Sequence, residues 1–259
     1  MKKGTRILQV TLLLLGLLIA PTSSMAFDQG NASRIIKDIE EMMRGTASIG
    51  EMEMTVHNPK WERTMKMKFW ESVPDKMLVR VTAPAQDVGV GTLKLGDDLW
   101  SYNPHIDQIQ KIPPSLMLDS WMGSDFTNDD ITRESSITDD YTVENLEEGA
   151  IGKEKTWRIT SRPKPSSPVG WDLLVIEATQ DGHRPLRQEY YNEKKELVRV
   201  MIYSDYKLAN NGKLYPFKWR MESKREENRF TEVKVLSMEF KDKLSKRIFS
   251  IRSLKKGRR

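Results

Sequence analysis

The stretch SWMGSDFTNDD, residues 120–130, sets three aspartates among large apolar side chains. Asp125, Asp129 and Asp130 are of a residue type that binds divalent cations or exchanges protons. A calcium loop of the EF-hand type that starts at Asp125 needs glycine at its sixth position and glutamate at its twelfth. The sequence has Asp130 and Ser136 there, so the spacing does not fit. We therefore interpret the aspartates as turn and helix-capping residues.

Other side chains that could do chemistry are scattered along the chain. His57, His105 and His183 have no metal-ligand partner three or four residues away. The pattern S-x-x-K occurs at Ser161 and Ser204 in or beside predicted strands, whereas the nucleophile of S-x-x-K acyl enzymes opens a helix. The chain has no G-x-S-x-G elbow and no phosphate-binding P-loop. The sequence therefore predicts no catalytic residue, no metal site and no cofactor, and a protein that is not an enzyme.

The spacing of apolar residues predicts the elements that position these side chains. Residues 31–44 (NASRIIKDIEEMMR) place isoleucine and methionine on one face of a helix, with Asn31 as its N-cap and Gly45 as its stop. From residue 51 onward, short runs alternate apolar and polar residues between turns. This pattern predicts about ten or eleven strands in an antiparallel meander, which curls strongly or closes on itself.

One loop and one odd segment interrupt the meander. The proline-rich loop 162–170 could separate two domains, but strands of the same type lie on both sides, so we expect a single domain. Residues 113–130 start with two prolines, and Gly123 is expected to end a short helical piece before Asn128 caps the next one. Four large apolar residues lie within helical reach of one another in that piece: Leu116, Met117, Trp121 and Met122.

The start of the chain has the pattern of a secretory signal peptide. Residues 1–26 contain three basic residues, then the apolar run 7–20, then Ser24 and Ala26 at the two recognition positions. The run is shorter than the roughly 20 residues that span a bilayer. No cysteine occurs anywhere, so we expect neither a lipid anchor on an N-terminal cysteine nor a disulfide. We expect residues 1–26 to be removed and residues 27–259 to form one soluble periplasmic domain.

The charge balance excludes one class of partner. The chain has 42 basic and 37 acidic residues, and the predicted signal peptide holds three of the basic ones and none of the acidic ones. The remaining near-neutral chain shows none of the clustered positive field that nucleic-acid binding requires, so we expect no nucleic-acid partner. The basic sequence KKGRR at 255–259 could contact anionic lipid head groups, but so short a run is more often a solvated tail.

Methionine is the unusual component of the chain. Of 14 methionines, seven lie on the predicted first helix and the first three predicted strands. Methionine fills irregular and changing apolar shapes at little rotamer cost. Composition alone leaves an ordinary core and an adaptable binding cavity equally open.

A predicted helix followed by a methionine-rich meander with helical interruptions resembles the outer-membrane lipoprotein-sorting family, the LolA-like periplasmic carriers. The resemblance covers essentially all residues after the predicted signal peptide and points to a broad branch of the family rather than to its best-known lipoprotein carrier. Its most specific pieces are DKMLVRVTAPAQDVGVGTLKLGDDLWSYNP (residues 75–104), KIPPSLMLDSWMGSDFTNDDI (residues 111–131) and KLYPFKWRMES (residues 213–223).

The resemblance implies a mainly β fold, in which one antiparallel sheet curls into an unclosed β-barrel. The N-terminal helix and short helical lid segments would cover its concave face and enclose an apolar lipid-binding cavity. The residues that would face this cavity or form its lid are Ile35, Ile39, Met42, Met43, Leu116, Met117, Trp121, Met122 and Phe126.

The resemblance also implies a function and partners. The protein would bind the acyl chains of a lipoprotein or envelope lipid and carry it toward the outer membrane, between an inner-membrane transporter of ABC or RND type and an outer-membrane acceptor. An alternative is a non-enzymatic accessory protein of an envelope exporter, whose cavity its own side chains would fill. An exported lipid-ester hydrolase would need a serine or histidine that reaches the cavity, and the sequence offers no such pair.

Overall fold

The computed structural model describes residues 29–43, 45–132, 137–165, 167 and 169–255. The predicted signal peptide, residues 1–26, lies outside the described residues. None of the described helices is long and apolar enough to cross a membrane.

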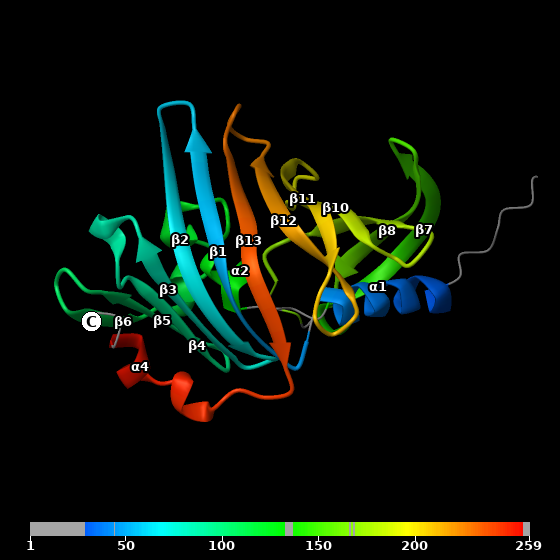
Figure 1. Ribbon diagram of the computed structural model, residues 1–259. Helices are drawn as coiled ribbons and strands as arrows, with labels where there is room; N and C mark the ends of the chain where they lie inside the picture. The colour runs from blue at the N-terminus through cyan, green and yellow to red at the C-terminus, as the bar shows by residue number, and fades with distance from the viewer. Residues whose placement is uncertain (1–28, 44, 133–136, 166, 168, 256–259) are drawn as a thin grey trace, which may run out of the picture.

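The described residues form one antiparallel sheet of thirteen strands with few helices (Figure 1). The sheet order is β6-β5-β4-β3-β2-β1-β13-β12-β11-β10-β9-β8-β7. The strands are β1 (Ala47–Asn58), β2 (Trp61–Ser72), β3 (Lys76–Ala83), β4 (Gly91–Leu95), β5 (Asp98–Asn103), β6 (Gln108–Lys111), β7 (Tyr141–Ile151), β8 (Glu154–Pro163), β9 (Leu173–Thr179), β10 (Pro185–Tyr191), β11 (Leu197–Leu208), β12 (Leu214–Ser223) and β13 (Phe230–Lys241). Within these residues β6 and β7 end the order without pairing to each other, so the curled sheet is unclosed and the predicted fold class is confirmed.

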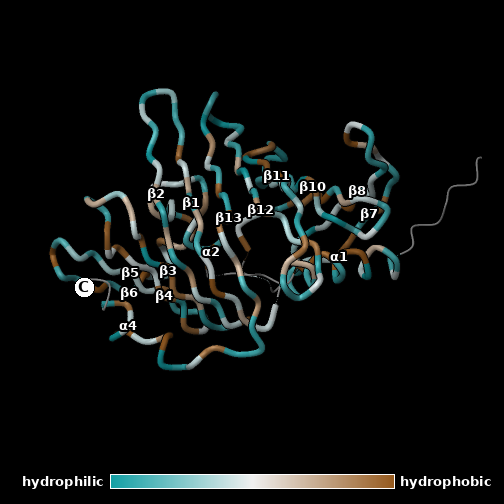
Figure 2. Tube along the Cα trace, viewed as in Figure 1, coloured by the Kyte–Doolittle hydropathy of each residue, from teal (hydrophilic) through white to brown (hydrophobic). Residues whose placement is uncertain are grey.

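Alternation of apolar and polar residues gives each strand one buried face (Figure 2). On β2, Met65 and Met67 are fully buried while Lys66 and Lys68 are exposed. The two β2 methionines stand opposite two methionines of β1 in the register, Met54 with Met65 and Met52 with Met67. The methionines noted in the sequence therefore meet on the concave face of the sheet.

The structure has more strands than the ten or eleven predicted, and β7 is the strand that the sequence pattern did not indicate. It is the edge strand next to β8, and most of its residues are polar or charged (YTVENLEEGAI). Only Tyr141 and Val143 are buried in it. An edge strand that buries little has a weak alternating signal, and its charges protect the unpaired edge from aggregation.

The first helix, α1 (Gln29–Met43), packs across the β7–β9 end of the concave face (Figure 1). It begins two residues before the predicted N-cap, so that prediction was wrong: Asn31 lies in the first turn and accepts a hydrogen bond from Arg34 at 3.1 Å. The predicted stop at Gly45 agrees with the end of the helix at Met43. A side chain at position 45 would collide with the ring of Phe240, because an added Cβ would lie 2.2 Å from it.

The convex face at β3–β6 has its own small core. Leu78, Leu93 and Tyr102 of the sheet pack there against Phe249 and Leu254. The last two residues come from the segment that contains η4 (Lys246–Ile248) and α4 (Ile251–Lys255), which lies outside the sheet (Figure 1). The remaining short helices are η1 (Ala85–Asp87), η2 (Pro114–Leu116), η3 (Trp121–Gly123), α2 (Asn128–Thr132) and α3 (Ile137–Asp140).

Candidate functional site: an apolar cavity beneath a lid

A cavity of ≈ 350 Å³ lies on the concave face, between the sheet, α1 and residues 113–131, which we name the lid segment. This volume lies within the range of small-molecule pockets, roughly 300–1,000 Å³. Its apolar wall comes mainly from strand residues that point inward: Met52, Phe69, Met77, Val79, Leu174, Met201, Met221, Val233 and Val235. The loop before β9 adds Val169, Gly170 and Trp171.

Four of the nine residues that the resemblance placed around a cavity line this one: Ile39, Met43, Trp121 and Phe126. Ile35 is fully buried behind them, where α1 packs on β7–β9. The others do not line the cavity: Met42 and Met117 are half-buried, Leu116 is exposed, and Met122 packs against the main core from the side. The strand residues of the wall were absent from the expected set, although their alternation already placed them on one face of the sheet.

The lid segment is a compact folded loop. Its ends are joined by the backbone bridge between Ser120 and Thr127 and by a bond from the Asn128 N–H to the Asp119 carbonyl at 2.9 Å. The tight turn at its tip uses positive φ at Met122 (52°) and Gly123 (76°). Glycine suits such a backbone, and a methionine there indicates that the surrounding contacts hold it in place.

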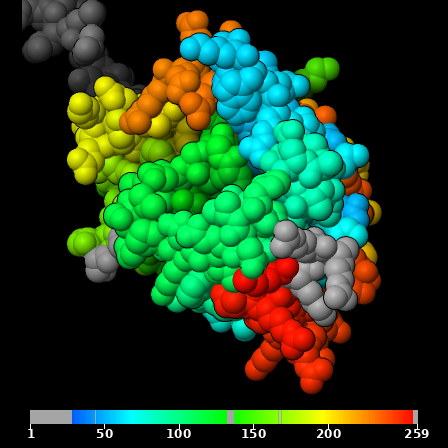
Figure 3. Space-filling view, turned by 90° about the vertical axis from the view of Figure 1, so that its left-hand side faces the viewer, coloured from blue at the N-terminus to red at the C-terminus, as the bar shows by residue number. Residues whose placement is uncertain are grey.

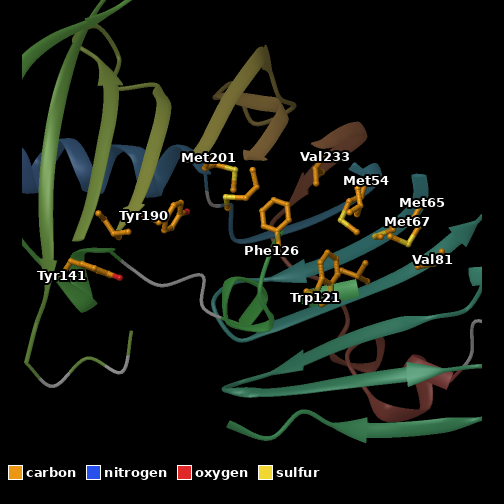
Figure 4. Close-up of a cluster of buried hydrophobic side chains, with 14 residues drawn as sticks. Met54, Met65, Met67, Val81, Trp121, Phe126, Tyr141, Tyr190, Met201 and Val233 are labelled. Atoms are coloured by element: carbon orange, nitrogen blue, oxygen red, sulfur yellow. The ribbon is translucent and has the colours of Figure 1, made fainter. Parts of the chain in front are cut away.

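Two aromatic side chains of the lid segment point down onto the sheet (Figure 4). Trp121 and Phe126 are only 5% and 7% exposed and belong to the main core, together with Met54, Met67 and Val81. The indole N–H of Trp121 donates to the hydroxyl of Thr92 on β4 at 3.1 Å. The lid segment is therefore attached to the β4 side of the sheet by an apolar anchor with a satisfied polar atom.

On its other side the lid segment is attached by Asp125. The carboxylate of Asp125 accepts from Arg229 Nε at 2.8 Å and from the hydroxyl of Thr231 at 2.7 Å. The backbone N–H of Asp125 in turn donates to the Thr231 hydroxyl at 2.8 Å. Asp125 therefore joins the lid segment to β13 and the turn before it, and its predicted turn role was too simple.

The second attachment is a buried ion pair between Asp130 and Arg199 of β11. Arg199 donates from both terminal nitrogens to the two carboxylate oxygens, at 2.7 and 2.5 Å. Its guanidinium carbon lies 4.4 Å from the ring centres of both Trp171 and Tyr190, so the cation is also held between two aromatic rings. Burial disfavours the charged guanidinium, but the charge of Asp130 outweighs it, and the pKa of Arg199 lies above its ordinary value.

Asp130 also performs the capping role that the sequence indicated. Its carboxylate accepts from the Thr127 N–H at 2.7 Å, and the Thr127 hydroxyl accepts from the Asp130 N–H at 3.1 Å. This reciprocal pair is a capping box at the start of α2. The partners Arg199 and Arg229 could not be found by spacing, because they lie 69 and 104 residues away in the chain.

Tyrosines line the other end of the cavity. Tyr141 and Tyr190 lie at the opposite end of the core from Met54 and Met65 (Figure 4). Tyr203 of β11 lies close to Gln188 of β10, with 3.5 Å between its hydroxyl and the Gln188 side-chain oxygen. Burial raises the pKa of both Tyr190 and Tyr203, so both phenols are neutral hydrogen-bonding groups at physiological pH. The cavity thus has a methionine-rich end and an end with neutral polar atoms.

The structure separates the other residues that could do chemistry. His57, His105 and His183 contact Glu62, the Gln86 carbonyl and Asp38 respectively, in three different places. No three histidine, aspartate or glutamate side chains of the described residues gather closely enough to hold a metal ion. The described residues that line the cavity include no serine and no histidine.

With this geometry in hand, comparisons with known proteins become informative. A family model described as "Uncharacterized protein" matches residues 74–256. No curated protein sequence matches the chain. Among solved structures, a domain assigned to the outer membrane lipoprotein-sorting proteins, from Vibrio parahaemolyticus, has a TM-score of 0.77 at 21% identity and covers 88% of this chain and 100% of its own.

Two further structures agree. A DUF1329 family protein from Desulfovibrio piger has a TM-score of 0.79 at 22% identity, covering 87% of this chain and 98% of its own. A LolA superfamily protein from Nitrosomonas europaea has a TM-score of 0.71 at 20% identity, covering 86% and 98%.

The chain belongs to the matched family and has the LolA-like fold. The resemblance predicted from residues 75–104, 111–131 and 213–223 is thereby confirmed. Because each of these solved structures is covered almost completely, the helix, the sheet and the lid region together make up the shared fold.

Proposed function

We propose that this protein is a periplasmic carrier that encloses the acyl chains of a lipoprotein or envelope lipid and takes them toward the outer membrane. In this proposal residues 1–26 are a cleaved signal peptide and residues 27–259 form the carrier domain. The partners are an inner-membrane transporter that loads the carrier and an outer-membrane acceptor that unloads it.

The cavity itself is the observation that carries the proposal. An accessory protein that kept the fold without a cargo would fill this space with its own side chains. Here ≈ 350 Å³ stays unfilled between Met52, Met77 and the lid segment, and most of the lining is aliphatic, thioether or aromatic. Flexible methionines suit chains of differing shape. The absence of serine and histidine from the described lining also counts against the lipid-ester hydrolase.

Energetics explain why such a cargo needs an enclosed site. Each methylene group contributes roughly 0.8 kcal/mol when it leaves water, so a sixteen-carbon chain costs on the order of 12 kcal/mol to expose. One or two hydrogen bonds do not offset that cost. Transfer from a bilayer to an apolar cavity is nearly neutral by comparison, so direction comes from the donor and acceptor proteins.

The lid segment supplies the gate in this mechanism. Its attachments to β4, β11 and β13 close it over the cavity, and the ion pair between Asp130 and Arg199 is the strongest of them. Both ends of the lid segment are joined to different strands, so loading requires release of at least one attachment. Polar contacts suit this role, because water can replace them when the lid opens.

The experiment compares matched methionine substitutions. Met52 and Met77 line the cavity, whereas Met238 of β13 is half-buried and does not. In the variant Met52→Gln/Met77→Gln, two amides face the bound chain without partners, at about 1–3 kcal/mol each. We expect at least a tenfold loss of affinity for a fluorescent fatty-acyl probe, while Met238→Gln binds like the unsubstituted protein.

Native mass spectrometry of the protein purified gently from envelope fractions complements this test. A stoichiometric acylated species, lost in the Met52→Gln/Met77→Gln variant, supports the carrier and identifies its cargo. If the unsubstituted protein has a clean apo mass and fails to take up the probe, the carrier proposal is wrong and the exporter-accessory alternative replaces it.

A further inference from the structure

Positive charge is concentrated at one end of the chain. Residues 241–259 contain nine lysines and arginines and one acidic residue, whereas residues 27–240 contain 30 basic and 36 acidic residues. The low net charge of the whole chain hides this asymmetry. Six of the nine basic residues lie in the described part, residues 241–255.

Four of these cations are exposed and form no ion pair within the described part of the chain: Lys243, Lys246, Arg247 and Arg252. Elsewhere on the described surface many cations are matched, as Lys68 is by Glu51 and Lys111 by Asp98. Unmatched neighbouring cations repel one another, and an anionic partner relieves that repulsion.

The segment that carries these cations is fixed to the protein rather than a free tail. Phe249 and Leu254 are 6% and 0% exposed in the convex-face core. Ser245 caps η4 by accepting from the Arg247 N–H, and Arg80 donates to the carbonyl of Ser253. The four cations are therefore held at defined places on the surface, and ordering them on a partner costs little further backbone entropy.

Exposed apolar side chains accompany the cations. Ile251 is 37% exposed beside Arg252, and Ile106, in the turn between β5 and β6, is 64% exposed. Lys255 bridges the two segments, because its ammonium lies 3.3 Å from the carboxylate of Asp107, the neighbour of Ile106. Cations next to apolar side chains are the combination that binds the interface of an anionic bilayer.

We propose that residues 241–255 and the β5–β6 turn form a docking surface for an anionic phospholipid bilayer. Lys243, Lys246, Arg247 and Arg252 contact lipid phosphates, and Ile106 and Ile251 enter the interface. Figure 3 shows this C-terminal segment, in red, on the same face as the green part of the chain that includes the lid segment. Docking would therefore bring the lid segment near the bilayer, although binding to the bilayer does not depend on the cavity holding a cargo.

The test is flotation of the purified full chain with vesicles of phosphatidylcholine, with and without phosphatidylglycerol. We expect binding to the anionic vesicles only, and its loss at high salt. The variant Lys243→Gln/Lys246→Gln/Arg247→Gln/Arg252→Gln should bind at least about tenfold more weakly. The matched control removes four other exposed cations without printed ion pairs, Lys153, Lys155, Lys194 and Arg225, and should bind normally.

Several outcomes would overturn the proposal: no binding to anionic vesicles, equal binding to neutral ones, or equal losses in the test and control variants. Binding that is instead found only to an acidic protein would assign the surface to a different partner. If the fourfold variant folds poorly, the pair Lys246→Gln/Arg252→Gln and the salt titration of the unsubstituted chain decide the question. The Met52→Gln/Met77→Gln variant should still bind vesicles, which separates this proposal from the carrier function.

Discussion

The ion pair between Asp130 and Arg199 should control opening of the lid segment, and Asp130→Asn tests this. Asparagine keeps the size of the side chain and can still accept from the Thr127 N–H. It leaves Arg199, which is 4% exposed, with its charge buried and unmatched. Removing one partner of a buried pair costs about 3–5 kcal/mol.

Two features of the site reduce that figure. The Asp130 side chain is 20% exposed, so water reaches part of the pair, and the rings of Trp171 and Tyr190 continue to stabilise the cation. We therefore expect a loss of about 2–3 kcal/mol in the free energy of lid opening. This corresponds to roughly 30- to 150-fold faster amide exchange where exchange proceeds through opening.

Hydrogen exchange followed by mass spectrometry measures this directly. Peptides that cover residues 117–131 should exchange faster in Asp130→Asn, whereas peptides from β8 and β9 should not change. The fluorescence of Trp121 should shift to longer wavelength as the buried indole meets water. The rate of acyl-probe entry should rise with the exchange rate if the lid segment is the gate.

A double-mutant cycle provides the control. Arg199→Met removes the cation, and the double variant has neither a buried charge nor an unmatched partner. We expect the double variant to be less destabilised than the sum of the single variants by about 2 kcal/mol. Additive effects within about 0.5 kcal/mol would refute the reasoning, because the two residues would then not be coupled.

Two further predictions concern the attachment to β4 and the acid stability of the sheet. Thr92→Val leaves the indole N–H of Trp121 buried without an acceptor, so denaturant unfolding should show a loss of about 1–3 kcal/mol; an unchanged midpoint would show that the bond contributes nothing. Burial raises the pKa of Glu232, but hydrogen bonds from Lys218 and Lys234 lower it more, so its pKa lies below the ordinary value. Glu232 therefore stabilises the fold above its unfolded pKa, and this contribution disappears as the pH falls through its folded pKa. Glu232→Gln should flatten the loss of stability between about pH 5 and pH 3, and an unchanged acid profile would contradict this.

Local periodicity predicted the parts of the fold that depend on local periodicity. The α1 face with Ile35 and Ile39 and the inward methionines of β1–β3 follow from repeats of 3.6 and two residues. Edge strand β7 escaped because its exposed positions carry little alternation. Its place at the end of the sheet depends on neighbours, which no local pattern encodes.

The site was predictable to a smaller extent. The resemblance placed Trp121 and Phe126 in the lid, and both line the cavity. The aspartates had the expected tendency to cap and turn, but their ion pairs with Arg199 and Arg229 depend on chain segments brought together only by the curled sheet. Met117 and Leu116 sit outside the cavity because short 3₁₀ turns replace the longer helix that their spacing suggested.

The unpaired strands β6 and β7 give the sheet a freedom that a closed cylinder lacks. A closed ring of strands fixes its own circumference, since every change of diameter must break hydrogen bonds along some seam. Here the sheet can flatten or tighten its curvature with all twelve strand pairings intact. Cargo of different bulk would then be accommodated by bending rather than by unzipping. The lid segment, joined to β4 on one side and to β11 and β13 on the other, sets how far that bending goes.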